Sequence, residues 1–369
     1  MKSMLYWTHL PWGWIKQRPH FIAENLAGSY DVTICCKKNY HTKNLTNEKS
    51  PANIPFWEIF ALPFCRIGVM NLLTKLLIHR QMRTRINNFD IIWINHPAMF
   101  YYVREIIKPE THLVYDCMDD SLEFPVVRSD RKKTLRLKKL EEGLLARADT
   151  VFVSSAHLKD VLCSRYNSTK IMNLLNNGID QIILGRGQVK PATESIDKIK
   201  EIPLNKIMYL GTIAGWIDFD LILKSLEELD DIVYILVGPV EIDLPTHDRI
   251  VLISPVEHSQ VFALMEVADV LVMPFVVTDL VRSVNPVKVY EYIYSGKPSL
   301  VVNYSETLQF QQFVTLYDDS SDYIRKLKSI LNGNEVTKTD VTAQAQHFIA
   351  DNTWEKRVAD INKVLETKP

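Results

Sequence analysis

The residues best placed to do chemistry lie between positions 282 and 298, where two charged side chains enter a short apolar helix. The sequence reads Arg282-Ser-Val-Asn-Pro-Val-Lys288-Val-Tyr-Glu291-Tyr-Ile-Tyr-Ser-Gly-Lys-Pro298 and continues into the apolar run 299–302. Proline favours a helix start and glycine a helix end, which predicts a helix over 287–295 and then a buried strand. Lys288 and Glu291 would lie in its opening turns, where unpaired backbone N–H groups favour a phosphate. The alternative is a solvated helix start without a ligand.

This segment resembles the nucleotide-sugar site of GT-B glycosyltransferases, in particular glycosyltransferase family 4, with its Pro-x-Lys-x-x-Glu-Tyr-x-x-x-Gly-Lys-Pro pattern. The resemblance implies that Glu291 accepts hydrogen bonds from the ribose of a UDP- or GDP-linked sugar, which is a substrate. No cofactor and no metal ion is implied. Most family members carry a second Glu eight residues earlier, where this chain has Ser283. How the sugar itself is held is therefore open.

The resemblance also extends to the turn Tyr209-Leu-Gly211-Thr-Ile-Ala-Gly-Trp216. Its glycines let the backbone approach a ligand. The family usually places an Arg and a Lys shortly after this turn to neutralise the diphosphate, but this chain has Trp216, Asp218 and Asp220 there. The expected cations are therefore Arg282 and Lys288.

In the first half of the chain, polar residues follow several predicted strands. The loop after the first strand contains Trp14, Arg18 and His20, which by resemblance line the acceptor side; a packing role for the loop is equally open. His96 follows the strand at 91–95, and the resemblance places it at the donor sugar near the reacting carbon. Without that resemblance, a structural histidine is the more frequent case.

A group of carboxylates, Asp116-Cys-Met-Asp119-Asp120, follows the strand at 113–117. Asp119 and Asp120 are candidates for a general base toward an acceptor hydroxyl, which an inverting transferase requires. They are also suited to cap the next helix. Loose binding of a cation is the weakest of the three interpretations.

Length and composition place the chain among globular α/β proteins. Its 369 residues exceed the usual size of one core, and 47% hydrophobic with 24% charged residues is typical of folded domains. Apolar runs alternate with amphipathic stretches, which predicts parallel sheets covered by helices. Five cysteines without metal-ligand spacing indicate reduced core residues in a cytoplasmic protein. No secretory leader or membrane-spanning segment is predicted.

The expected fold is α/β, with two Rossmann-like domains facing a central cleft as in GT-B proteins. The predicted parts are an acceptor-side domain over 1–184, a linker over 185–206, a nucleotide-sugar-binding domain over 207–350 and a C-terminal helix over 351–369. Trp354, Val358, Ile361 and Leu365 share one face of that helix. This face predicts that the helix crosses back and packs on the first domain.

The charge is divided unevenly. Residues 1–180 carry 25 Lys and Arg against 17 Asp and Glu, whereas residues 181–369 carry 18 against 27. The stretch 61–88 has no acidic residue and places Arg66, Lys75, Arg80, Arg83 and Arg85 among leucines. Such a helix is suited to an anionic bilayer surface, unless it is simply half-buried with a solvated basic side.

Together these features predict a cytoplasmic glycosyltransferase at the inner face of the membrane. It would move a sugar from a nucleotide-diphosphate donor to a hydroxyl of a lipid-linked or oligosaccharide acceptor, for a capsule, O-antigen or teichuronic-acid type glycan. The resemblance implies retention at the anomeric carbon, and Ser283 leaves inversion open. No nucleic-acid partner is expected. The alternatives are a sugar-nucleotide epimerase of the same architecture and an inactive GT-B partner subunit.

Overall fold

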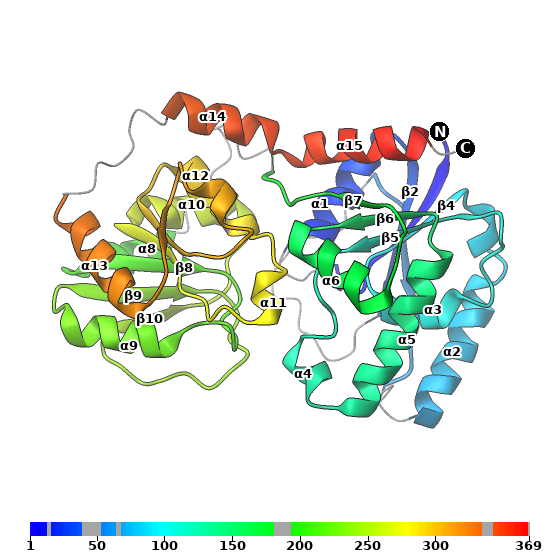
Figure 1. The fold of residues 1–369 in the computed structure, drawn as a ribbon, viewed down its shortest axis with the longest axis horizontal. Helices are drawn as coiled ribbons and strands as arrows, with labels where there is room; N and C mark the ends of the chain where they lie inside the picture. The colour runs from blue at the N-terminus through cyan, green and yellow to red at the C-terminus, as the bar shows by residue number, and fades with distance from the viewer. Residues whose placement is uncertain (13–15, 39–52, 64–67, 181–192, 334–341, 368–369) are drawn as a thin grey trace. The chain divides into compact units, whose positions relative to one another are not determined.

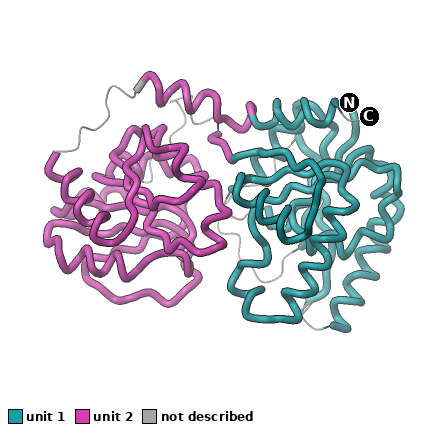
Figure 2. Tube along the Cα trace, viewed as in Figure 1, with its two compact units in different colours: residues 1–176, 357–369 teal, residues 177–356 magenta. Residues whose placement is uncertain are grey.

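The computed structural model describes residues 1–12, 16–38, 53–63, 68–180, 193–333 and 342–367. The chain divides into two compact units (Figure 2). Unit 1 comprises residues 1–176 and 357–369, and unit 2 comprises residues 177–356. The chain therefore passes from unit 1 to unit 2 and returns at its C-terminal end.

Unit 1 is built on a seven-stranded parallel sheet of order β3-β2-β1-β4-β5-β6-β7 (Figure 1). Its strands are β1 (Ser3–Trp7), β2 (Asp31–Lys37), β3 (Phe56–Ile59), β4 (Ile91–Ile94), β5 (His112–Cys117), β6 (Thr150–Val153) and β7 (Met172–Leu174). Its helices include α1 (Arg18–Leu26), α2 (Gly68–Met82), α3 (Pro97–Val103), α4 (Pro125–Arg128), α5 (Arg131–Arg147) and α6 (Ala156–Tyr166). The strand order reverses between β1 and β4, and open α/β sheets bind ligands beyond the carboxyl ends of such strands.

Unit 2 repeats this layout with a six-stranded parallel sheet of order β10-β9-β8-β11-β12-β13. Its strands are β8 (Asn205–Leu210), β9 (Ile232–Val237), β10 (Ile250–Ile253), β11 (Val270–Met273), β12 (Ser299–Val302) and β13 (Thr315–Tyr317). Its helices are α8 (Thr193–Lys200), α9 (Phe219–Glu228), α10 (His258–Val267), α11 (Asp279–Arg282), α12 (Val287–Ser295), α13 (Ser320–Leu331) and α14 (Thr342–Asp351). Here the order reverses between β8 and β11, which marks the corresponding position in this unit.

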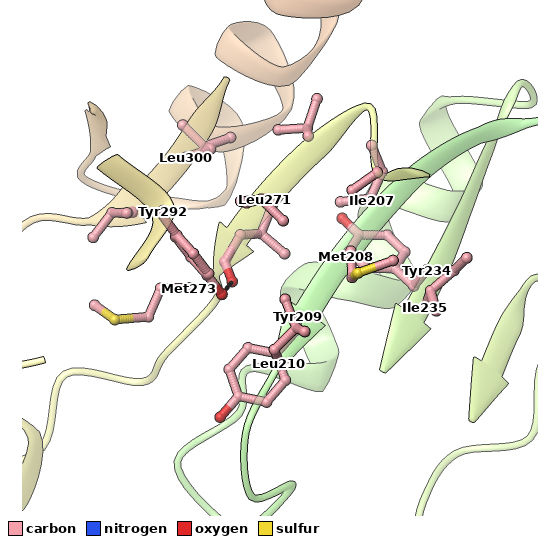
Figure 3. Packing of buried hydrophobic residues seen from close by; sticks show 14 of the residues in the cluster. Ile207, Met208, Tyr209, Leu210, Tyr234, Ile235, Leu271, Met273, Tyr292 and Leu300 are labelled. Carbon is pink, nitrogen blue, oxygen red and sulfur yellow. Dashed lines mark hydrogen bonds between the residues drawn. The ribbon is translucent and has the colours of Figure 1, made fainter. Parts of the chain in front are cut away.

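The core of unit 2 explains the continuous apolar runs of its strands. Tyr209, Leu271 and Leu300 belong to three neighbouring strands, are almost completely buried, and lie in one cluster (Figure 3). Helices cover both faces of a parallel sheet, so its strands have no solvent-facing side. This burial fixes the ends of β8 and β11, and with them the loops that form the candidate site.

Three elements differ from the sequence prediction. The predicted linker over 185–206 contains α8, whose Ile196 and Ile199 are buried in the core of unit 2. Residues 181–192 lie outside the described residues. The three-residue strands β7 and β13 were not predicted, because apolar runs of that length carry too little pattern.

The C-terminal helix agrees with its prediction. Helix α15 spans Trp354–Glu366, and its residues from Arg357 onward belong to unit 1. Its four predicted apolar residues are all buried: Trp354, Val358, Ile361 and Leu365. The amide of Asn362 donates a 2.9 Å hydrogen bond to Ser29, which follows α1.

Candidate active site

Lys288 lies directly over the turn that follows β8. Its Nζ is 3.1 Å from the hydroxyl of Tyr209 and 4.6 Å and 4.7 Å from the ring centroids of Tyr209 and Phe275. A Cβ on Gly211 would come within 3.2 Å of that Nζ, and the φ of Gly211 is +138°. Only glycine leaves this space open and adopts this backbone angle readily. Lys288 has no ion-pair partner among the described residues, so its charge is available to an anion.

The residues just after Gly211 include Asp218 and Asp220 and no Lys or Arg, so the cation beside this turn comes from α12. Asp218 is the N-cap of α9, and its carboxylate accepts a 2.9 Å hydrogen bond from the backbone N–H of Leu221. Asp220 adds a second negative charge to the first turn. Carboxylates at this end stabilise the helix and occupy the position that a phosphate would otherwise favour. The Asp residues found in place of the usual Arg and Lys therefore cap a helix.

Glu291 is held by a residue that the sequence analysis did not single out. Its Oε1 lies 2.8 Å from Nε2 of His258, the first residue of α10. A carboxylate only accepts hydrogen bonds, so this Nε2 carries a proton and donates. Both side chains are largely buried, at 13% and 17% exposed. No local pattern marks His258; its proximity depends on the order of the strands.

The Asn177-Gly-Ile-Asp180 motif positions the start of α12. The backbone N–H of Asn177 donates to the side chain of Asn285 at 2.9 Å, and its side-chain amide donates to the Asn285 carbonyl at 2.6 Å. Asn285 immediately precedes Pro286, the N-cap of α12. A Cβ on Gly178 would come within 2.9 Å of the Asn352 carbonyl, so the close approach of two backbone segments requires glycine here. This motif has a structural role in unit 2.

Arg282 and Ser283 follow each other at the end of α11. Arg282 is exposed, whereas Ser283 is fully buried and donates to the Asp279 carbonyl at 3.2 Å. Ser283 is thus bonded to its own helix. Of the two predicted cations, Lys288 is the one that the structure places against Gly211.

In unit 1, His96 pairs with a second histidine at the reversal of strand order. His96 follows β4 and His9 follows β1, and their ring centroids are 4.8 Å apart. The Nδ1 of His96 accepts from the backbone N–H of Ala98 at 3.1 Å and so caps α3. Burial lowers the pKa of His96 well below 6.5, and the neighbouring His9 and Lys37 lower it further. The ring is therefore neutral at pH 7.

His9 is held in the opposite tautomer. The side-chain oxygen of Asn95 accepts from the backbone N–H of His9 at 3.2 Å and lies 2.9 Å from His9 Nδ1. This Asn95 oxygen can only accept hydrogen bonds, so the Nδ1 of His9 carries the proton and donates. The Nε2 of His9 is left as an acceptor. Burial lowers the pKa of His9 as well, with Lys37 adding to the effect and the Asn95 bond opposing it. The pair thus combines one acceptor nitrogen and, on His96, one donor nitrogen.

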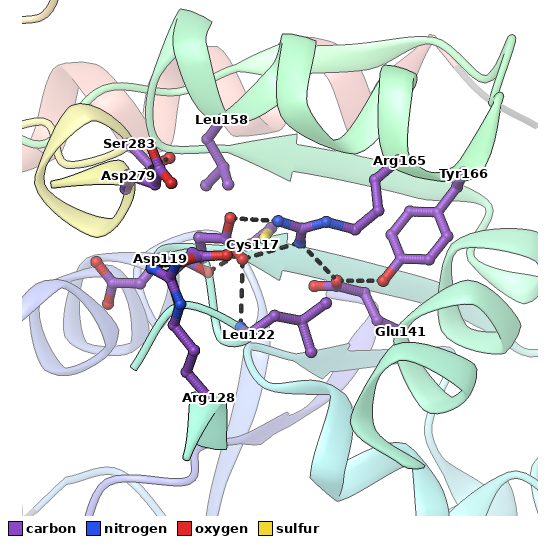
Figure 4. A network of polar contacts seen from close by, with 12 residues as sticks. Cys117, Asp119, Leu122, Arg128, Glu141, Leu158, Arg165, Tyr166, Asp279 and Ser283 are labelled. Carbon is purple, nitrogen blue, oxygen red and sulfur yellow. Dashed lines mark hydrogen bonds and ion pairs between the residues drawn. The ribbon is translucent and has the colours of Figure 1, made fainter. Parts of the chain in front are cut away.

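The carboxylates after β5 have separate roles. Asp120 is 2% exposed and forms an ion pair with Arg165 of α6 at 2.5 Å. Arg165 also lies 3.5 Å from Glu141 of α5, which accepts a 2.6 Å hydrogen bond from Tyr166 (Figure 4). Asp120 therefore anchors its loop, because both its oxygens bind Arg165, and its role as a catalytic base stays a prediction.

Asp119 is the carboxylate that remains as a candidate. Burial raises its pKa to about 6, the nearby carboxylates of Asp116 and Asp120 raise it as well, and Arg18 opposes them. A carboxylate with a pKa near neutrality is suited to exchange a proton with a substrate. The network around Asp120 and Arg165 holds the loop on which Asp119 lies.

Two of the predicted acceptor-side residues, Arg18 and His20, lie in the interior of unit 1. Arg18 is 2% exposed; it binds Asp116 at 2.7 Å and donates to the Leu175 carbonyl at 2.7 Å. His20 is 3% exposed, its Nδ1 accepts from the backbone N–H of Gln17, and burial lowers its pKa to about 4. Both side chains are thus part of the interior of unit 1, where charge pairing and helix capping explain them. Trp14 lies outside the described residues.

The structure therefore brings Gly211, Lys288, Glu291 and the unpredicted His258 together in unit 2. In unit 1 it brings His96 to His9, with Asp119 on the loop after β5. Among the described residues, no cluster of three or more His, Cys, Asp or Glu is arranged to hold a metal ion. The four cysteines in the described part of the chain are free.

Comparisons with known proteins give the fold. No protein-family model matches the chain. The putative teichuronic acid biosynthesis glycosyltransferase TuaH of Bacillus subtilis (strain 168) is 24% identical over 243 residues, a match that covers 61% of this chain and 60% of the relative. The chain thus matches less than two thirds of the length of that curated relative.

Solved structures match over almost the whole chain. Sucrose-phosphate synthase from Thermosynechococcus elongatus superposes with a TM-score of 0.74 at 12% identity, covering 99% of this chain and 98% of the other. HepE of Anabaena, solved in complex with UDP and glucose, gives a TM-score of 0.71 at 14% identity with full coverage of both chains. The chain accordingly has the GT-B fold, an α/β architecture of two Rossmann-like units.

Proposed function

We propose that the chain is a glycosyltransferase that uses a nucleotide-diphosphate sugar. The observation that carries the proposal is the position of Lys288 over Gly211, at the reversal of strand order in unit 2, with Glu291 one helical turn further along α12. A cation beside an open glycine turn suits a diphosphate. A buried carboxylate on the same helix suits the two hydroxyls of a ribose.

The relatives support this assignment. TuaH of Bacillus subtilis is named as a putative glycosyltransferase, and HepE of Anabaena has been solved with UDP and with UDP-glucose. In this proposal, Lys288 stabilises the charge that develops on the leaving diphosphate. Glu291 binds the ribose, while His258 holds the carboxylate in place. Arg282, which is exposed at the end of α11, is a second cation for the diphosphate. Ser283 follows it as the C-cap of α11, at the start of the loop that leads to α12.

The acceptor side is assigned to unit 1. His96 Nε2 donates a hydrogen bond to the donor sugar, and Asp119 binds the acceptor hydroxyl. The acceptor is a lipid-linked or oligosaccharide precursor of a bacterial surface glycan, and the protein works at the inner face of the cytoplasmic membrane. We propose retention at the anomeric carbon, so the leaving diphosphate receives the acceptor proton. An inverted product would instead make Asp119 the general base.

Calorimetric titration of the purified chain with UDP and GDP tests the donor site first. Lys288→Met should weaken binding of the preferred nucleotide about tenfold or more, because a charged hydrogen bond contributes roughly 1.5–3 kcal/mol. Lys328→Met, an exposed lysine on α13, is the matched control and should bind as wild type. Equal affinity of Lys288→Met and wild type would refute the placement of the diphosphate.

Nucleotide release from a panel of UDP- and GDP-sugars then tests the reaction. A transferase releases nucleotide faster when an acceptor glycan is added. An epimerase would change the donor sugar whether or not an acceptor is present, and an inactive partner subunit would bind nucleotide without turnover. Either of these outcomes would replace the proposed activity while leaving the donor site intact.

A further inference from the structure

Helix α2 presents its apolar side to solvent. Val69, Leu72, Leu73 and Leu76 are 69%, 54%, 44% and 57% exposed. Their spacing of i, i+3, i+4 and i+7 places all four on one face of the helix. We call them the leucine stripe. An exposed apolar stripe of this kind marks an interaction surface.

The opposite face of α2 is buried, and its polar contacts fix the rotation of the helix. Asn71, Thr74 and Lys75 are buried, as are Ile78 and Met82, which belong to the apolar core of unit 1. The amide of Asn71 hydrogen-bonds the hydroxyl of Tyr102, and Lys75 binds Glu105 at 2.5 Å. Turning the leucine stripe inward would break these contacts. Lys75, expected from the sequence to be a surface cation, is instead buried and paired with Glu105.

Basic residues continue the stripe along the same face. Arg80 and Arg83 follow Leu76 at i+4 and i+7 and are exposed, and Arg85 is exposed beside them. No acidic residue occurs between positions 61 and 88. Arg66 lies outside the described residues. An apolar band that ends in cations is complementary to a bilayer with anionic headgroups, which accepts both kinds of side chain.

The neighbouring helix also carries basic residues. Arg136 of α5 approaches the Asn71 amide, at 2.9 Å from Nη1, so the first turns of α5 lie beside α2 (Figure 1). Arg131, Lys132 and Lys133 are exposed in those turns, and Leu135 is 52% exposed. Because Asn71 is on the side of α2 opposite the leucine stripe, the docking surface is assigned to the stripe and the arginines that follow it.

We propose that the leucine stripe and its flanking arginines dock unit 1 on an anionic lipid bilayer. No helix in the described part of the chain is long and apolar enough to cross a membrane. The docking is therefore interfacial: the leucines enter the headgroup and acyl boundary while the arginines remain with the phosphates. The inference deepens the proposed function, because it names the surface that would bring unit 1 to a lipid-linked acceptor.

Sedimentation with vesicles tests the proposal without any turnover. The full chain should bind vesicles of phosphatidylcholine mixed with phosphatidylglycerol and bind pure phosphatidylcholine more weakly, and added salt should reduce binding because exposed charges are screened. Arg80→Glu with Arg83→Glu should lower the affinity for the anionic vesicles about tenfold or more. Leu72→Ser, Leu73→Ser and Leu76→Ser combined should abolish binding to both vesicle types.

Matched controls change similar residues elsewhere. Ile171→Ser with Leu308→Ser removes exposed apolar residues outside α2, and Arg325→Glu with Lys328→Glu reverses exposed charges on α13. Both should bind vesicles as wild type. Thermal melting of every variant identifies misfolding. Nucleotide titration of every variant shows whether the donor site still binds, so that a failed donor site is distinguished from a failed docking surface.

Two outcomes would overturn the proposal. The first is that no form of the protein binds vesicles. The second is that the serine variant binds vesicles as wild type does, in which case sedimentation velocity shows whether a wild-type dimer has become monomeric in that variant. That result would assign the leucine stripe to contacts between copies of this chain.

Discussion

Glu291 has two carboxylate oxygens, and His258 occupies one of them at 2.8 Å. In the proposed donor site the other oxygen binds the ribose, which requires a carboxylate that does not rotate. His258 lies at the first position of α10, which fixes its own backbone. The two residues are therefore expected to act as a unit, in which one binds and the other orients.

Their variants should separate these roles. Glu291→Ala should weaken UDP or GDP binding at least tenfold, since a hydrogen bond to a charged group contributes roughly 1.5–3 kcal/mol. His258→Phe should weaken it less, because the carboxylate remains and only its orientation is lost. Isothermal calorimetry measures both. The exposed Glu266→Gln on α10 is the control, and a larger loss for His258→Phe than for Glu291→Ala would contradict the assignment.

The tautomers of His9 and His96 in unit 1 can be tested without any substrate. Backbone N–H groups fix Asn95 and His96, so His9 should carry its proton on Nδ1 and His96 on Nε2. The pKa of each is lowered, so both should stay neutral as the pH falls through 6.5. Nitrogen NMR of labelled protein distinguishes the tautomers, with His96→Gln used to assign the signals. The same tautomer on both rings would disprove the arrangement.

A neutral His96 that donates to the sugar would act mainly in the transition state. His96→Ala should then lower kcat with little change in donor affinity. His347→Gln, at a histidine whose side chain is 82% exposed, is the control. If kcat is unchanged, His96 serves only to cap α3.

At the scale of elements, the loop after β5 depends on its contacts with α5 and α6. Arg165 is the common partner of Asp120 and Glu141, and both carboxylates are almost fully buried. Removing the cation leaves buried charges unpaired, which costs about 3–5 kcal/mol. Arg165→Leu should therefore lower the free energy of unfolding of unit 1 by that amount, measured by chemical denaturation. Adding Asp120→Asn should recover part of the loss; no recovery would mean that the charge pairing is unimportant.

The sequence predicts most elements because their boundaries are local. Helix α12 has the predicted bounds, and Pro286 and Gly296 cap it as expected. In contrast, α8 was missed because only Ile196 and Ile199 mark its buried side. The leucine stripe shows the opposite difficulty: an apolar pattern predicts a buried face, whereas these four residues are exposed and Asn71, Thr74 and Lys75 are buried beside Ile78 and Met82.

The candidate site was predictable only in part. Gly211, Lys288 and Glu291 belong to short motifs with a mechanism of their own, so the sequence could indicate them. His258 becomes a partner through strand order, and Arg18 becomes an interior residue through Asp116, which is 98 positions away. Contacts between distant segments of this kind leave no local signal.

At the scale of the whole molecule, helix α15 completes unit 1 from the other end of the chain. Ile361 is fully buried, and Ile→Ala changes in cores cost about 2–5 kcal/mol. Ile361→Ala should therefore destabilise unit 1 and leave unit 2 unchanged. Calorimetric melting with and without UDP separates the units, since a ligand of unit 2 raises only its own transition. A lowered transition in unit 2 would contradict this division.

The discontinuity of unit 1 has a consequence for synthesis on the ribosome. Unit 2 is one continuous stretch, residues 177–356, whereas unit 1 needs residues 357–369 as well. Chains elongate at about 5–20 residues per second. The N-terminal part of unit 1 therefore leaves the ribosome first. Its surface that receives Val358, Ile361 and Leu365 stays uncovered until unit 2 and α15 have been synthesised. Codon choice and chaperone supply late in translation should govern how much of the earlier half reaches its native state.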